Sequence, residues 1–201
     1  MPKGRVNQSI WTPANIVTVI RVAALPLWLL LAQLSVPATD SVSISSLVVF
    51  VLYVLISLTD KLDGYLARSR NEVSSFGQFL DPIADKLAVT VALCYLLESG
   101  LTNSWVLLVI LSREFLVSGL RMVVASKGVV VPASNLGKWK TAITMVSICS
   151  LLLVMALPQG VFADRLHLAG NVGMAIALVL TAWSGVDYFM KCWPYVIGKR
   201  R

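Results

Sequence analysis

Long apolar stretches limit the folds open to this chain more than any other feature of its sequence. Hydrophobic residues make up 57% of its 201 residues and charged residues only 13%, whereas about a quarter of an average soluble domain is charged. The apolar residues come in long blocks, and not in the short alternating runs of a soluble core. We therefore expect a helical protein embedded in a membrane.

Six of these blocks have the length of a membrane span. A helix needs roughly 20 apolar residues to cross the hydrocarbon core of a bilayer, and turn-forming residues separate the blocks. The predicted spans cover residues 16–34, 44–66, 77–97, 103–125, 141–158 and 167–190. We predict an all-α integral membrane protein with six transmembrane helices, in which residues 1–201 form a single membrane-embedded domain.

Basic residues gather on one side of the predicted spans. The chain holds 17 lysines and arginines against 10 acids, which gives a net charge of +7. Connections on one side carry most of them, including Lys3, Arg5 and residues 199–201, and the other side carries Arg165 alone. Since cytosolic loops hold the excess of basic residues, we expect a multi-pass protein of the inner (cytoplasmic) cell membrane with both termini cytosolic. The scattered charges form no solvated basic face, which argues against nucleic acid as a partner.

Two aspartates share one face near the end of the second span. Asp60, Asp63, Gly64 and Ala67 stand at positions i, i+3, i+4 and i+7 of the expected helix. About 24 Å of helix separates residue 44 from Asp60, which places this carboxylate roughly 6 Å inside the cytosolic edge of the hydrocarbon core. One helical face therefore offers two carboxylates beside two positions with little or no side chain.

The third span begins with a matching set of residues. Gly77, Asp81 and Asp85 stand at positions i, i+4 and i+8. A connection of about ten residues makes the second and third spans antiparallel neighbours. We therefore expect all four carboxylates to converge just inside the cytosolic interface.

Four carboxylates at one place in a membrane would repel one another and take up protons unless positive charge lies among them. Two divalent cations carry the charge that balances them, and an all-oxygen site without nearby His or Cys favours Mg²⁺ or Mn²⁺ over Zn²⁺. The pattern predicts a phosphoryl-transfer site with one or, in our preferred interpretation, two metal ions.

Two other interpretations of the aspartates stay open. The acids could form buried salt bridges with Lys61, Arg68 and Lys86, although this gives no reason for the small residues on the same faces. The protein could also be a membrane cation carrier, since intramembrane carboxylates mark ion paths. Against the carrier, the acids cluster at one depth and form no ladder across the membrane.

The full pattern is Asp60-x2-Asp63-Gly64-x2-Ala67-Arg68-x8-Gly77-x3-Asp81-x3-Asp85. It resembles, without departure, the signature of the CDP-alcohol phosphotransferase family. The resemblance implies six membrane helices, a homodimer and an active site at the cytosolic interface. It also implies transfer of a group from a CDP-linked lipid to an alcohol, with release of CMP.

The resemblance further implies roles for individual residues. The metal ligands would be Asp60, Asp63, Asp81 and Asp85, and Asp85 would also be the catalytic general base. Crowding by like charges makes such a base plausible, because it raises the proton affinity of a carboxylate. The CDP-binding residues would be Asp60, Asp63, Gly64, Ala67, Arg68 and Gly77. Spacing within the first span adds Asn15, which forms with Thr18 and Arg21 a polar strip at i, i+3 and i+6 that could face the nucleotide, and helix packing explains the strip nearly as well.

Further segments bear on the acceptor alcohol. PANIVTVIRVAALP (with Ala14 between Pro13 and Asn15), SREFLVSGLR, LGKWKT and SGVDY are similar to segments of the bacterial phosphatidylglycerophosphate synthase branch of the family. That branch implies CDP-diacylglycerol as the donor, sn-glycerol 3-phosphate as the acceptor and phosphatidylglycerophosphate as the product. Phosphatidylglycerol, as in cardiolipin synthesis, and inositol phosphate are the alternative acceptors.

Four basic residues support a phosphate-bearing acceptor. Arg113 and Arg121 stand eight residues apart on one face of the fourth span, and an arginine as deep as Arg113 needs an anionic partner, for which Glu114 is the neighbouring candidate. Lys138 and Lys140 precede the fifth span. Together these four cations could surround the phosphate of glycerol 3-phosphate, although the lysines also fit ordinary positive-inside flanking.

Overall fold

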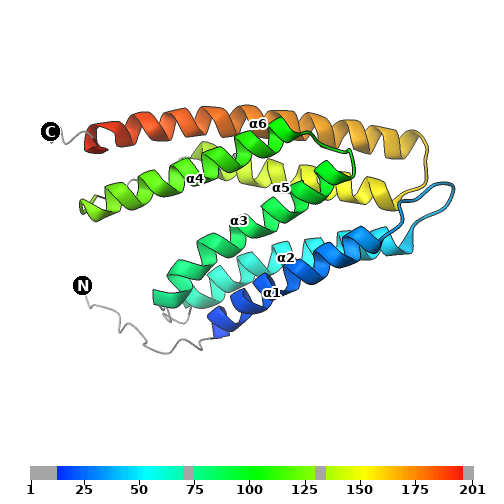
Figure 1. The fold of residues 1–201 in the computed structure, drawn as a ribbon, viewed down its shortest axis with the longest axis horizontal. Coiled ribbons are helices and arrows are strands. Elements are labelled where there is room, and N and C mark those ends of the chain that lie inside the picture. Colours follow the sequence, from blue (N-terminus) through cyan, green and yellow to red (C-terminus); the bar gives the residue numbers. More distant parts are fainter. Residues whose placement is uncertain (1–12, 70–74, 130–134, 197–201) are drawn as a thin grey trace. The chain divides into compact units, whose positions relative to one another are not determined.

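The computed structural model describes residues 13–69, 75–129 and 135–196, and it is entirely helical in these ranges apart from the connections (Figure 1). Within the helices, the side chains of residues 13–14, 60–69, 75–79, 81–82, 135 and 196 are outside the description. The helices are α1 (Pro13–Leu34), α2 (Ile44–Ser69), α3 (Ser75–Glu98), α4 (Ser104–Ser126), α5 (Asn135–Ala156) and α6 (Val161–Val196). The predicted all-α class and the order of the six helices are confirmed.

The first four helices begin within three residues of their predicted starts, whereas α5 and α6 each begin six residues early. The early turns contain charged residues, Lys138 and Lys140 in α5 and Asp164 and Arg165 in α6, which lower the local hydropathy although the helix has already begun. The 36 residues of α6 span about 54 Å at the rise of an α-helix, which exceeds a hydrocarbon core of about 30 Å. His167 accordingly lies inside α6 and donates to or accepts from Asn171 at 3.0 Å.

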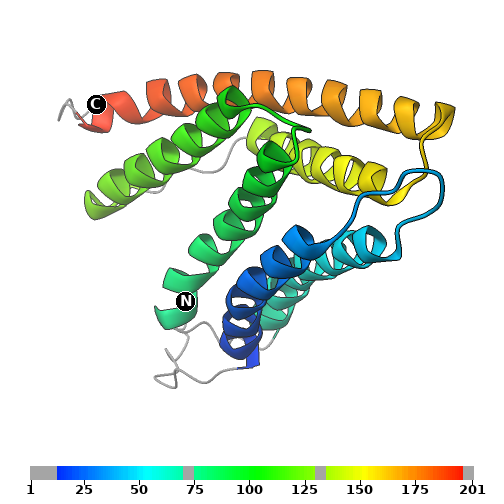
Figure 2. The ribbon, with the colours of Figure 1, turned by 45° about the vertical axis from the view of Figure 1, so that its right-hand side comes forward.

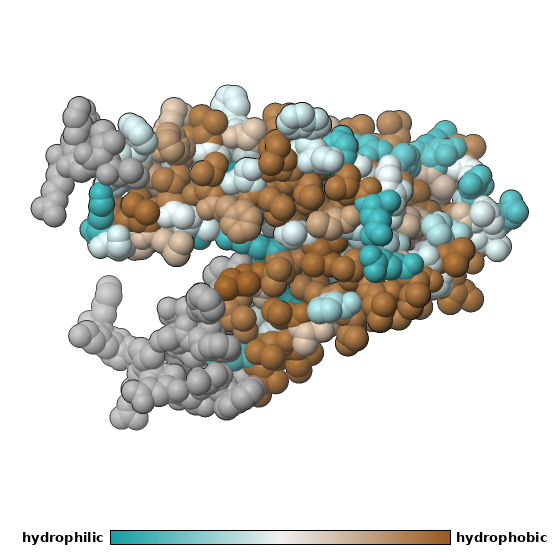
Figure 3. All heavy atoms as spheres, in the orientation of Figure 1, coloured by the Kyte–Doolittle hydropathy of each residue, from teal (hydrophilic) through white to brown (hydrophobic). Residues whose placement is uncertain are grey.

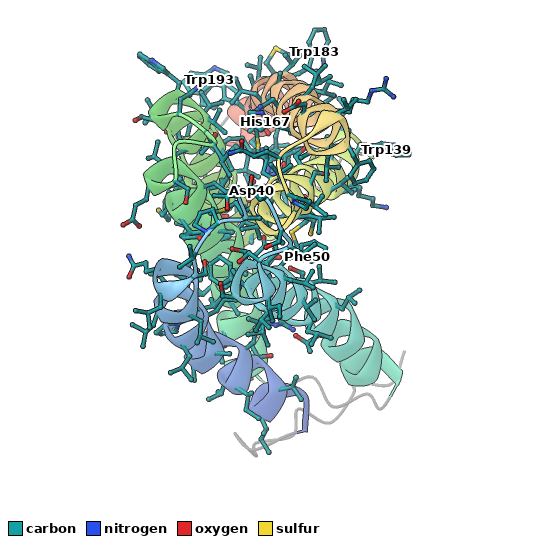
Figure 4. All side chains as sticks on the ribbon, turned by 90° about the vertical axis from the view of Figure 1, so that its right-hand side faces the viewer. Asp40, Phe50, Trp139, His167, Trp183 and Trp193 are labelled. Carbon is teal, nitrogen blue, oxygen red and sulfur yellow. The ribbon has the colours of Figure 1, made fainter. Side chains whose placement is uncertain are left out.

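Apolar surface covers these helices. Among the described residues, Asn15–Leu34, Leu136–Ala156 and Val161–Tyr195 are long and apolar enough to cross a membrane, and Ile44–Thr59 is a shorter apolar segment. Figure 3 shows hydrophobic side chains over much of the visible face, and Figure 4 shows Trp139, Trp183 and Trp193 pointing outward from α5 and α6. Large exposed apolar surfaces of this kind mark contact with lipid.

The chain forms two compact units. The first comprises Met1–Tyr95 and Leu152–Ala163 and therefore holds α1, α2 and most of α3. In it α1 and α2 run antiparallel: Trp28 Nε1 donates to the Val49 carbonyl at 2.9 Å, and Arg21 Nε donates to Thr59 Oγ1 at 3.4 Å. Trp28 also packs against the Tyr95 ring of α3, with ring centroids 5.8 Å apart. This packing fixes the helix, α2, that carries the first two aspartates.

The second unit comprises Leu96–Leu151 and Asp164–Arg201. Its α4 runs parallel to the C-terminal part of α6, and Lys127 Nζ at the end of α4 donates to the Tyr195 carbonyl at 2.6 Å. Its α5 runs antiparallel to α6 and approaches it closely, since a Cβ at Gly170 would lie 2.9 Å from Leu151 Cδ2. Small residues permit such close helix contacts in membranes. Figures 1 and 2 both show α4 and α5 alongside α6.

Candidate functional site

A pocket of about 390 Å³ lies in the second unit, between α4, α5 and α6. Its lining residues are Arg113, Glu114, Val117, Arg121, Gly137, Lys138, Lys140, Thr141 and Tyr188. Four cations thus face one carboxylate, which gives the pocket a positive field suited to an anionic ligand. The structure brings together all four basic residues that the sequence suggested for an acceptor phosphate, and their binding of that phosphate stays a prediction.

Glu114 joins two of these cations. Its Oε1 lies 3.1 Å from Arg113 Nη1 and also forms an ion pair with Lys140 Nζ, so that the carboxylate connects α4 to α5. The side chains of Arg113, Glu114 and Lys140 are only 13%, 21% and 8% exposed. Charges so deeply placed require partners. The predicted pairing of Arg113 with Glu114 is confirmed, and the pairing across to Lys140 was not foreseen.

Arg121 and Lys138 are the exposed cations of the pocket. The Arg121 guanidinium lies 5.9 Å from the centroid of the Tyr188 ring, a cation–π distance. This contact orients the arginine. Its N–H donors stay available for a ligand, because the aromatic face contacts the plane of the guanidinium and forms no hydrogen bonds with the N–H groups at its edge.

Helix α6 supplies the side of the pocket that the sequence did not assign. A Cβ at Gly185 would lie 3.1 Å from Arg113 Cγ, so the glycine leaves room for the arginine stem. Tyr188 follows three residues later on the same face and is 3% exposed. The SGVDY segment, similar to one in the synthase branch, covers residues 184–188, and no role was predicted for its individual residues. Ser184 Oγ donates to the Thr181 carbonyl within α6, and Asp187 pairs with Lys191 at 2.7 Å.

The predicted aspartates lie on the expected helices of the first unit: Asp60 and Asp63 on α2, and Asp81 and Asp85 on α3. Five residues, 70–74, connect the two helices, so the helix ends lie no more than about 22 Å apart. The described Asp85 side chain is exposed.

The remaining predicted residues of this region lie outside the described side chains. They are Asp60, Asp63, Gly64, Ala67, Arg68, Gly77 and Asp81. No group of three His, Cys, Asp or Glu residues that could hold a metal occurs among the side chains that are described. Carboxylates supply the oxygen ligands that suit Mg²⁺ or Mn²⁺, and the binding of a divalent ion by Asp60, Asp63, Asp81 and Asp85 stays a prediction.

The polar strip of α1 packs beside the start of the aspartate segment. Asn15, Thr18 and Arg21 are 4%, 1% and 4% exposed, and Arg21 Nε donates to Thr59, the residue before Asp60. Helix packing therefore accounts for much of this strip. Binding of CDP by Asn15 stays a prediction.

The chain belongs to the CDP-alcohol phosphatidyltransferase family, whose match covers residues 11–183. This confirms the resemblance found in the aspartate pattern. Several relatives carry the name CDP-diacylglycerol–glycerol-3-phosphate 3-phosphatidyltransferase, and three of them follow. The Bacillus subtilis protein is 38% identical over 89% of this chain and 94% of its own length. The Rickettsia bellii protein is 39% identical over 90% of this chain and 95% of its own length. The Pseudomonas fluorescens protein is 37% identical over 90% of this chain and 90% of its own length.

Proposed function

We propose that this protein transfers the phosphatidyl group of CDP-diacylglycerol to sn-glycerol 3-phosphate, which gives phosphatidylglycerophosphate and CMP in phospholipid biosynthesis. The main support for this acceptor is the pocket, whose lining includes four cations and one carboxylate: Arg113, Arg121, Lys138, Lys140 and Glu114. The names of the relatives support the same donor and acceptor.

The charge of the pocket favours a phosphomonoester as the acceptor. Glycerol 3-phosphate carries close to two negative charges near neutral pH, because the second pKa of a phosphomonoester is about 6. Phosphatidylglycerol carries a single diester charge and a neutral glycerol head. Four cations against one carboxylate match the dianion better. Inositol phosphate has the same monoester group, so for this alternative the names of the relatives decide in favour of glycerol.

The donor is expected at the aspartates of α2 and α3. In this proposal Asp60, Asp63, Asp81 and Asp85 hold one or two Mg²⁺ or Mn²⁺ ions, which would neutralise the diphosphate of the CDP-lipid. Asp85 takes the proton from the attacking hydroxyl of the acceptor as general base. Asn15, Gly64, Ala67, Arg68 and Gly77 receive the cytidine nucleotide, where small residues permit close approach.

We also propose a membrane topology and an oligomeric state for the enzyme. Residues 1–201 act as one multi-pass domain of the cytoplasmic membrane, with both termini and the active site on the cytosolic side, and two copies form a homodimer. The distribution of basic residues supports this orientation.

CMP release tests the function directly. Purified protein in detergent, supplied with CDP-diacylglycerol and Mg²⁺, should release CMP with glycerol 3-phosphate and not with inositol phosphate, phosphatidylglycerol or buffer alone. Asp85→Asn should abolish the release, whereas Asp40→Asn, in the exposed α1–α2 connection, should match the wild type. CMP release with a different alcohol would correct the acceptor. No release with any alcohol, together with Mg²⁺ flux into liposomes, would favour the cation carrier instead.

A further inference from the structure

The hydroxyl of Tyr188 is buried at the acceptor pocket, and the Cys192 thiol is the weak hydrogen-bonding group beside it among the described residues. We propose that Tyr188 is a specificity-determining residue, and that its hydroxyl and the Arg113 Nε together bind the phosphate of the acceptor. This inference rests on the proposed function, because it assigns two further contacts to the same pocket.

The surroundings of Tyr188 explain why its hydroxyl stands out. The residue packs in a cluster with Val117, Val124 and Cys192, and the hydroxyl contacts the Cys192 thiol, which is a weak hydrogen-bonding group. Phenylalanine would fill this apolar site at least as well, because burying a hydroxyl without a partner is unfavourable. A ligand oxygen in the pocket gives the hydroxyl a partner.

Arg113 carries another buried donor at the same pocket. Its Nη1 pairs with Glu114 at 3.1 Å, and its Nε is buried without a hydrogen-bond partner among the described residues. The pairing through Nη1 leaves the Nε side of the guanidinium for another acceptor, and arginine binds phosphate in a bidentate manner with such an edge. The two buried donors therefore call for the same kind of ligand.

Residues 185–188 of α6 lie against both Arg113 and Arg121 of α4. Gly185 lies against the Arg113 stem, where a Cβ would be 3.1 Å from Cγ, and the Tyr188 ring lies below the Arg121 guanidinium at 5.9 Å. One turn of α6 thus borders both cations of α4. An oxyanion bound in the pocket would have Tyr188, Arg113 and Arg121 among the residues that line its site.

Tyr188→Phe removes the hydroxyl and keeps the ring. Loss of a hydrogen bond to a charged group should raise the KM for glycerol 3-phosphate by about tenfold, with kcat and the KM for CDP-diacylglycerol within about twofold of the wild type. Inorganic phosphate should bind the purified variant more weakly by a similar factor in calorimetric titration. The unfolding temperature without acceptor should stay close to that of the wild type, because within the described structure the hydroxyl gives up only its weak contact with the Cys192 thiol.

Tyr95→Phe is the matched control. It removes a buried tyrosine hydroxyl that lies 3.2 Å from Ser35 Oγ in the first unit, and it should leave phosphate binding and the KM for glycerol 3-phosphate unchanged. Wild-type phosphate affinity in Tyr188→Phe, or a lowered unfolding temperature with equal rises in both KM values, would overturn the inference. A wild-type protein that binds phosphate but releases no CMP with glycerol 3-phosphate would refute the proposed function instead, and the titration would still decide the role of Tyr188.

Discussion

Lys140 on α5 forms an ion pair with Glu114 on α4, and Glu114 holds Arg113 at the same oxygen. This pair links two of the three helices that border the acceptor pocket. It also fixes two of the four pocket cations before any ligand arrives, so that less side-chain freedom is lost on binding. The carboxylate therefore orders the pocket, although its charge opposes that of a phosphate.

Glu114→Gln should destabilise the protein more than an ordinary surface change. It leaves Lys140, 8% exposed, without its carboxylate, and breaking a buried pair on one side costs about 3 kcal/mol or more. Asp187→Asn is the control, because its partner Lys191 is 56% exposed and such surface pairs contribute about 1 kcal/mol or less. Thermal unfolding in detergent, followed by tryptophan fluorescence, measures both. Equal unfolding temperatures for the two variants would contradict a structural role for the Glu114 pair.

Arg121→Ala should weaken the use of glycerol 3-phosphate far more than that of CDP-diacylglycerol. The exposed guanidinium lies in the pocket over Tyr188, and loss of one charge-assisted phosphate contact corresponds to about a tenfold or larger rise in KM. Arg121→Lys should fall between, because lysine keeps the charge but not the bidentate edge. Arg165→Ala, at the exposed start of α6, serves as the control in the same steady-state assay. Equal effects of Arg121→Ala on the KM values of both substrates would show that Arg121 does not bind the acceptor specifically.

The sequence was sufficient for the features that depend on spacing within one helix. The interval of three residues between Asp60 and Asp63, and of four between Asp81 and Asp85, predicted the family and the helices that carry them. The eight-residue interval between Arg113 and Arg121 placed both arginines on one face, and both line one pocket.

Features that depend on contacts between helices could not be predicted in this way. The Lys140–Glu114 pair joins residues 26 positions apart, and Tyr188 meets Arg121 from another helix. No period within a single helix specifies either contact. The early starts of α5 and α6 were missed because hydropathy reports the surroundings of a residue, whereas a helix continues wherever its backbone hydrogen bonds do.

Gly173→Ala should test the close packing of α5 on α6. A Cβ at Gly173 would overlap the Ser147 hydroxyl, which donates to the Ile143 carbonyl at 2.8 Å and would have to leave that rotamer. We expect a loss of stability of about 1 kcal/mol, visible in thermal unfolding, and recovery in the Gly173→Ala, Ser147→Ala double variant. Gly119→Ala, inside α4 with no atom within 4 Å of the added Cβ, should be neutral or slightly stabilising. Wild-type stability of the Gly173→Ala single variant would contradict close packing at this position, because α5 and α6 would then move apart without cost.

Removal of divalent ions and substitution of Asp85 distinguish the binding of CDP-diacylglycerol from the chemical step of CMP release. Chelation should abolish CMP release, and Mg²⁺ or Mn²⁺ should restore it, because four carboxylates on α2 and α3 need compensating charge to hold a diphosphate. Asp85→Asn should lower kcat by about 10²-fold or more, the usual contribution of a general base, while the protein still binds CDP-diacylglycerol. Glu98→Gln, an exposed acid at the end of the same helix, should keep wild-type kcat. If Asp85→Asn instead lost CDP-diacylglycerol binding at unchanged kcat, Asp85 would be a donor-binding residue, and the hydroxyl of the acceptor would have to pass its proton to another base.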